Sequence, residues 1–186
     1  MQDSMLLLPI MSSDRIRARA MIMQPNIKID MKPITERPID VVMFGKSCPR
    51  RELIKSRILE QHPDWKVEIK VLTDIINLTE AYSNAKICLT VHATPGPCGG
   101  EYHRLSETAP FGCVSVMENV TDACWLNPYM ECAGVHFATF DTIISKLAEV
   151  MDGIRTQPDH WLLKQSSMVE WWRKSNSWQD QLLKLA

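Results

Sequence analysis

The stretch "DVVMFGKSCPRRELIKSRILEQH", residues 40–62, decides the fold. Its opening run, "DVVMF", is short, apolar and β-branched, which is typical of a buried strand. A glycine and a short polar loop follow. The rest of the stretch places its apolar side chains on one helical face, at Leu53, Ile54, Ile58 and Leu59. The stretch therefore predicts a strand, a glycine loop and a helix, in that order.

This unit recurs along the chain. Further strands are predicted at residues 65–72, 86–92, 113–117 and 134–139. Further helices are predicted at residues 77–85, 101–109 and 142–154, the last of them capped by Asp141. Strands that alternate with helices at this interval indicate βαβ units, right-handed crossovers and a mostly parallel sheet. We expect an α/β fold, a Rossmann-like domain of three layers.

The domain itself is expected to span residues 40–155. Residues 1–39 contain scattered prolines and no sustained period, so they are interpreted as a linker or arm. Residues 156–186 form a tail rich in tryptophan, with Trp161, Trp171, Trp172 and Trp178. Two interpretations of this predicted helical tail stay open. It packs on its own domain, or it presents an apolar patch for self-association or a protein partner.

Composition excludes several classes of function. With 186 residues, 45% of them hydrophobic, and a formal net charge of -1, the chain can bury a core but is too neutral to favour nucleic acid. The apolar run at residues 5–11 is too short to span a bilayer, and no signal-peptide pattern accompanies it. We therefore expect a cytoplasmic protein with no membrane span and no nucleic-acid partner.

The six cysteines lie apart from one another and are interpreted as small buried side chains. A zinc site of His92, Cys98 and His103 is the alternative, but the chain lacks the paired spacing that such sites use. No metal and no cofactor are therefore expected.

In parallel sheets of this kind, ligands bind beyond the carboxyl ends of the strands. The loop "FGKSCPRR" lies at such an end and combines Gly45 with a helix start and with Lys46, Arg50 and Arg51, a pattern that favours an anion. The alternative is a tight turn with solvated basic residues. The motifs G-x-G-x-x-G and G-x-x-x-x-G-K-S/T are absent, which disfavours a nicotinamide cofactor or an ATPase.

A second candidate segment is "TVHATPGPCGGEYHRLSE", residues 90–107. His92 ends a predicted strand, a loop rich in proline and glycine follows, and the next helix carries Glu101, Arg104 and Glu107 roughly on one side. A solvated face held by salt bridges is the simpler interpretation. The position of the segment between two buried strands favours a ligand crevice instead.

The run "RLSETAPFGCVSVMEN" resembles the signature of the carboxyl-terminal half of GT-B glycosyltransferases, with Glu107 and Gly112 at its two marked positions. The wider pattern "DVVMFG...PRR...KICLTVH...E..RLSE....GCVSVMEN" is similar to the CgeB-like glycosyltransferase group, over about residues 40–151. The resemblance implies a single half of a GT-B fold, the half that binds a nucleoside diphosphate sugar for transfer to an acceptor that the sequence does not identify.

The same resemblance implies roles for individual residues. Glu107 would accept hydrogen bonds from the ribose hydroxyls. Arg104 and the loop at Gly45, with its basic residues, would hold the diphosphate. His92 and Glu101 would lie near the sugar as the catalytic candidates. Members of this fold usually need no catalytic metal.

This chain departs from the family pattern in two places. Glu101 and Glu107 are six positions apart, closer than the spacing of the paired glutamates in many relatives. The 39 residues before the predicted domain are also too few to form an acceptor half. A nucleotide-sugar-binding module without catalysis, or one that depends on a partner chain, is therefore the alternative. A flavodoxin-like or response-regulator-like domain is a third alternative, and the lack of an acidic cluster after the first predicted strand disfavours the latter.

Overall fold

The computed structural model describes residues 31–71, 75–96, 104, 107–120 and 134–175. Five strands form one open, all-parallel sheet in the order β2-β1-β3-β4-β5. They are β1 (Ile39–Phe44), β2 (Val67–Lys70), β3 (Ala85–Thr90), β4 (Val114–Glu118) and β5 (Val135–Ala138). The predicted α/β, Rossmann-like fold is confirmed, and all five predicted strands are present, β2 being shorter than expected.

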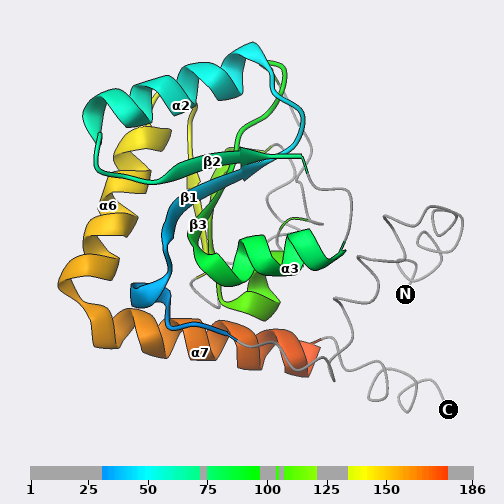
Figure 1. Ribbon diagram of the computed structural model, residues 1–186, viewed down its shortest axis with the longest axis vertical. Helices are drawn as coiled ribbons and strands as arrows, with labels where there is room; N and C mark the ends of the chain where they lie inside the picture. Colours follow the sequence, from blue (N-terminus) through cyan, green and yellow to red (C-terminus); the bar gives the residue numbers. More distant parts are fainter. Residues whose placement is uncertain (1–30, 72–74, 97–103, 105–106, 121–133, 176–186) are drawn as a thin grey trace, which may run out of the picture.

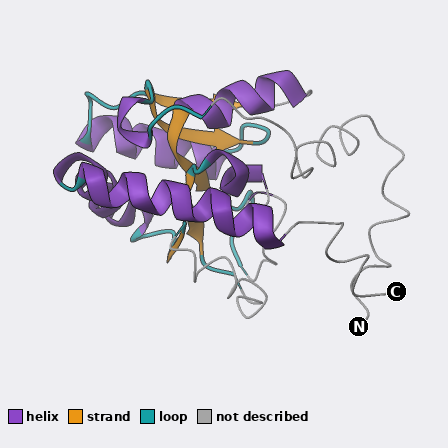
Figure 2. Cartoon of the chain, turned by 90° about the horizontal axis from the view of Figure 1, so that it is seen from below, coloured by secondary structure: helices purple, strands orange, loops and turns teal. Residues whose placement is uncertain are grey.

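Helices cover both faces of this sheet (Figure 2). On one face, α2 (Pro49–Gln61) and α6 (Ile143–Thr156) pack over the strands and form the larger core cluster. On the other face, α3 (Ile75–Asn84) and the short helix η4 (Ala109–Phe111) form a second cluster. Every residue of β1 is buried, because a parallel strand in this position is covered on both sides.

Helix α2 buries a different face from the predicted one. Leu53 and Leu59 are 44% and 37% exposed, whereas Ile54 and Ile58 are fully buried and Arg51 nearly so. The buried positions recur at three and four residues, so the helical period was right but its apolar stripe is narrower. The start of α6 also differs, because Thr142 rather than Asp141 occupies the position before its first residue.

Helix α7 (Pro158–Ser175) runs along the end of the sheet where β1 begins (Figure 1). The side chain of Gln165 accepts a hydrogen bond from the backbone N–H of Ile34 and donates one to the carbonyl of Lys32, each at 2.9 Å. Met168 packs against Gly134, directly before β5. Helix α7 therefore covers the amino-terminal ends of the strands, and their carboxyl ends lie at the opposite end of the sheet.

Parts of the predicted arm and tail belong to the packed domain. Ile34, in the short helix η3 (Ile34–Glu36), is fully buried in the larger core cluster. In the tail, Trp161 and Trp172 are buried, so the described part of the tail packs on its own domain. Trp178 lies outside the described residues. No helix within the described ranges is long and apolar enough to cross a membrane.

The strand order places a topological switch point between β1 and β3. The chain leaves β1 for β2 on one side and then crosses to β3 on the other side. In doubly wound sheets with this order, ligands bind beyond the carboxyl ends of the strands at that switch point. The fold therefore directs the search for a site to the loops that follow Phe44 and Thr90.

Candidate functional site

The loop after β1 combines a glycine of positive φ with an open helix start. Gly45 has a φ of 131°, a conformation that side chains with a Cβ rarely adopt. Cys48 occupies the cap position of α2, and its side chain makes no capping hydrogen bond to this helix start. Pro49 is the first helical residue and has no N–H of its own to satisfy. The helix dipole and these free donors favour an anion here.

Arg51 links the two sides of the switch point. Its Nε donates to the carbonyl of Val91, beyond β3, at 3.1 Å, and its Nη1 donates to the carbonyl of Lys46, beyond β1, at 2.8 Å. The residue is only 9% exposed. Both acceptors are neutral, and no carboxylate of the described residues forms an ion pair with Arg51. A nearly buried positive charge therefore lies at this loop, and none of the described carboxylates compensates it.

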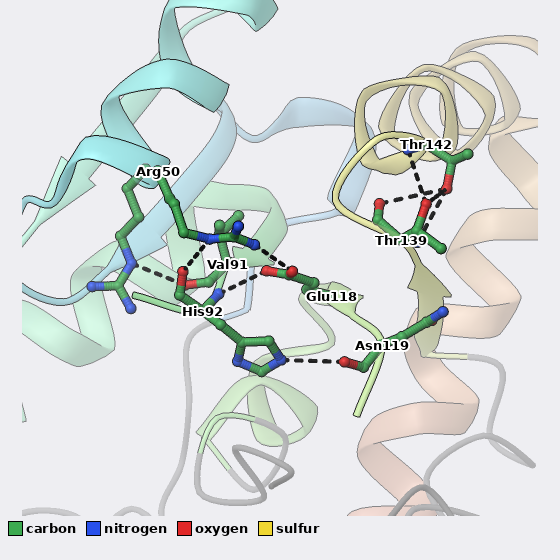
Figure 3. Close-up of polar contacts among 8 residues, drawn as sticks. Arg50, Val91, His92, Glu118, Asn119, Thr139 and Thr142 are labelled. Atoms are coloured by element: carbon green, nitrogen blue, oxygen red, sulfur yellow. Dashed lines mark hydrogen bonds and ion pairs between the residues drawn. The ribbon is translucent and has the colours of Figure 1, made fainter. Parts of the chain in front are cut away.

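The side chains of Arg50 and Glu118 bond to each other, and each also bonds to the backbone of His92 (Figure 3). Nη2 of Arg50 lies 2.5 Å from Oε1 of Glu118, and Nε donates to the carbonyl of His92 at 3.1 Å. The other carboxylate oxygen of Glu118 accepts the N–H of His92 at 3.0 Å. The Arg50 guanidinium stacks 3.9 Å from the ring centre of Phe140. Side chains from α2 and β4 thus hold the carboxyl end of β3.

The backbone carbonyl of Asn119, the residue directly after β4, orients the ring of His92. Its Nε2 lies 3.3 Å from the carbonyl oxygen of Asn119, as Figure 3 shows. A carbonyl oxygen only accepts, so Nε2 carries the hydrogen of this bond and Nδ1 of the neutral ring holds the lone pair. An imidazole in this state can accept a proton through Nδ1.

Arg104 and Glu107 lie inside the domain, at the end of β1. Arg104 donates to the carbonyl of Phe44 at 3.1 Å, and its Nη1 lies 3.6 Å from Oε2 of Glu107, which also accepts the hydroxyl of Tyr82 at 2.8 Å. Arg104 is 7% and Glu107 2% exposed, so the interpretation as a solvated salt-bridged face is wrong. Burial, with the negative charge of Glu107 beside it, raises the pKa of Tyr82 well above its usual value.

The structure brings part of the predicted site together. Gly45, Arg50, Arg51 and His92 meet at the carboxyl ends of β1 and β3, while Lys46 is exposed in the same loop. Glu101 lies outside the described residues. Sequence reasoning did not single out Glu118 as a site residue, although its position directly after a predicted strand was a usable signal.

Cys88 and Cys113 are buried, as the sequence predicted. Burial raises the pKa of the Cys113 thiol to about 12. Of the residues considered for zinc, Cys98 and His103 lie outside the described residues. The described part of the chain has no group of three or more side chains that could hold a metal ion.

The loop geometry predicts a specific effect of Gly45→Ala. The added Cβ would lie 2.6 Å from Nη1 of Arg51, so the variant both strains the backbone and displaces this guanidinium. We expect a loss of about 1 to 3 kcal/mol in the free energy of unfolding, measured by urea denaturation, and weaker anion binding in calorimetry.

Gly96→Ala is the matched control for this variant. Gly96 also has a positive φ, of 114°, but an added Cβ there would meet nothing within 4 Å. The Gly96→Ala change should lower the free energy of unfolding by a similar amount through backbone strain. Because its added Cβ does not touch Arg51, anion binding should stay intact. Equal binding by the two variants would show that the contact between Gly45 and Arg51 has no bearing on the ligand.

No protein-family model and no curated protein matches the sequence.

Proposed function

We propose that this domain binds a nucleoside diphosphate sugar, with the diphosphate at residues 45–51, and serves as the donor half of a glycosyltransferase. The observation that carries the proposal is Arg51, whose buried charge lies at the switch point without a carboxylate partner among the described residues. A diphosphate would supply the missing negative charge. The start of α2, which the side chain of Cys48 does not cap, would supply further donors to it.

The same groups fit the chemistry of glycosyl transfer. As the bond between the sugar and the diphosphate breaks, negative charge grows on the leaving diphosphate oxygen. Donors and cations fixed in place beforehand stabilise such charge without reorganisation. Arg51 is fixed by two backbone carbonyls and meets this requirement.

Two further residues have roles in the proposal. His92, with Nδ1 as its acceptor atom, is the candidate to receive the proton of the attacking hydroxyl. Glu107 is 2% exposed and bound to Tyr82 and Arg104, so its role in the proposal is to fix Arg104 at the end of β1 rather than to meet the ribose.

A binding module without catalysis is the alternative, because the described residues form no second site that would hold an acceptor. The two functions separate experimentally, since a module would bind the donor and never release its sugar. The deciding assay follows the donor in the presence of candidate sugar, lipid and peptide acceptors. Formation of the free nucleoside diphosphate together with a glycosylated acceptor supports the enzyme.

The first experiment is a calorimetric screen of the full chain against UDP-glucose, GDP-glucose and ADP-glucose, with the corresponding nucleosides as controls. The proposal predicts that at least one nucleotide sugar binds and that its nucleoside binds much more weakly, because the diphosphate contributes most of the attraction. Failure of all three to bind, or equal binding of sugar nucleotide and nucleoside, would contradict it.

A further inference from the structure

The three arginines at the carboxyl end of β1 and β3 differ in how their charge is balanced. Arg104 is paired with Glu107 inside the domain. Arg50 is paired with Glu118. Arg51 has only neutral backbone carbonyls as partners among the described residues. Because Glu118 offsets the charge of Arg50, the adjacent Arg50 and Arg51 together present one net positive charge to a ligand instead of two.

The pair of Arg50 and Glu118 brings a carboxylate from the end of β4 to residues 45–51. Arg50 directly precedes Arg51 in the first turn of α2, and both donate to consecutive carbonyls beyond β3, those of His92 and Val91. The side chains of Arg50 and Glu118 are partly accessible. An anion bound at Arg51 would therefore experience the charge of Glu118 as well as that of Arg50.

Donor and product of a glycosyl transfer differ in charge. The diphosphate of a nucleoside diphosphate sugar is esterified at both ends and carries two negative charges. Once the sugar has left, the terminal phosphate has a second ionisation near a pKa of about 6, so the nucleoside diphosphate carries almost three charges at neutral pH. A site rich in unpaired cations would hold this product more tightly than the donor.

We propose that Glu118 is a specificity-determining residue that favours the doubly charged donor over the more highly charged product. This inference rests on the proposed function of the domain. By offsetting Arg50, the carboxylate limits the positive charge available to the terminal phosphate, and the free nucleoside diphosphate leaves more readily. The other carboxylate oxygen of Glu118 accepts a hydrogen bond from the N–H of His92, which keeps this side chain in place.

The test compares UDP with UDP-glucose, GDP with GDP-glucose, and ADP with ADP-glucose, by calorimetry on the full chain and on Glu118→Gln. Glutamine keeps an oxygen for the N–H of His92 and removes the charge. We expect the ratio of donor Kd to product Kd to rise about tenfold, because the free diphosphate gains more from the loss of a nearby negative charge. The control is Glu60→Gln, which removes one negative charge from an exposed position of α2 and should leave this ratio unchanged.

A second variant keeps the inference testable if Glu118→Gln unfolds. Arg50→Gln leaves the carboxylate of Glu118 without its cation, so it should weaken the free diphosphates more than their glucose esters. An unchanged ratio in a folded Glu118→Gln or Arg50→Gln protein overturns the inference while the proposed function stands. Absence of binding by any nucleotide to the parent chain overturns the proposed function, and the inference with it.

Discussion

Replacing Arg37 by methionine is expected to lower the free energy of unfolding by about 3 to 5 kcal/mol, as measured by urea denaturation. The residue is 1% exposed, and burial lowers the pKa of its guanidinium, which still stays charged near neutral pH. It donates to the carbonyls of Ala85 at 2.8 Å, Tyr82 at 3.3 Å and Phe111. Methionine would leave buried acceptors unsatisfied, at about 1 to 3 kcal/mol each.

The size of this effect follows from where Arg37 lies. Three of its acceptors come from the junction of α3 with β3 and from η4, and its Nε donates to the carbonyl of Lys32 at 3.2 Å. One side chain therefore ties the segment before β1 to two regions that are distant from it in sequence. Arg173→Met, an exposed change on α7, is the control and should change stability by less than about 0.5 kcal/mol. A loss below about 1 kcal/mol for Arg37→Met would show that water satisfies these carbonyls instead.

Arg51→Met is expected to weaken binding of the nucleotide sugar by at least about thirtyfold, or roughly 2 kcal/mol, in calorimetry. Hydrogen bonds between charged partners are worth more than neutral ones, and no carboxylate of the described residues shares this guanidinium with the ligand. Affinity for the nucleoside alone should change little, because the nucleoside has no phosphate.

Two further variants separate binding from folding in this experiment. Arg57→Met removes an exposed arginine from the same helix and should bind like the parent chain. Arg51→Lys keeps the charge but loses the fork that spans two carbonyls, so it should recover part of the affinity. Parental affinity in a folded Arg51→Met protein would assign this residue a purely structural role.

The fold could be predicted because its strands have a strong signal. A parallel strand that is covered on both faces is apolar along its whole length, and the runs that became β1, β3 and β4 show this. The buried stripe of α2 was harder, because Arg51 lies inside and two leucines lie outside. The place of α7 at the amino-terminal ends of the strands depends on contacts such as that between Gln165 and Ile34, which are distant in sequence.

The site was predictable in part for similar reasons. A glycine directly after a strand and before a basic helix start is a local pattern, and it led to the loop at residues 45–51. Which arginine at the carboxyl ends of β1 and β3 keeps an unbalanced charge is not a local property. It depends on Glu118, which is 68 positions from Arg50 in the chain, and on Glu107, which folds inward to meet Tyr82.

The central claim is that residues 45–51 bind the diphosphate of a nucleotide sugar. The most direct measurement is a nuclear magnetic resonance titration of the isotope-labelled full chain with the nucleotide sugars of the calorimetric screen. The account predicts that the largest shifts fall on the backbone amide of Gly45 and on the side-chain Nε–H of Arg51. Shifts confined to α7, at the opposite end of the sheet, or no shifts with any of the three donors, would contradict it.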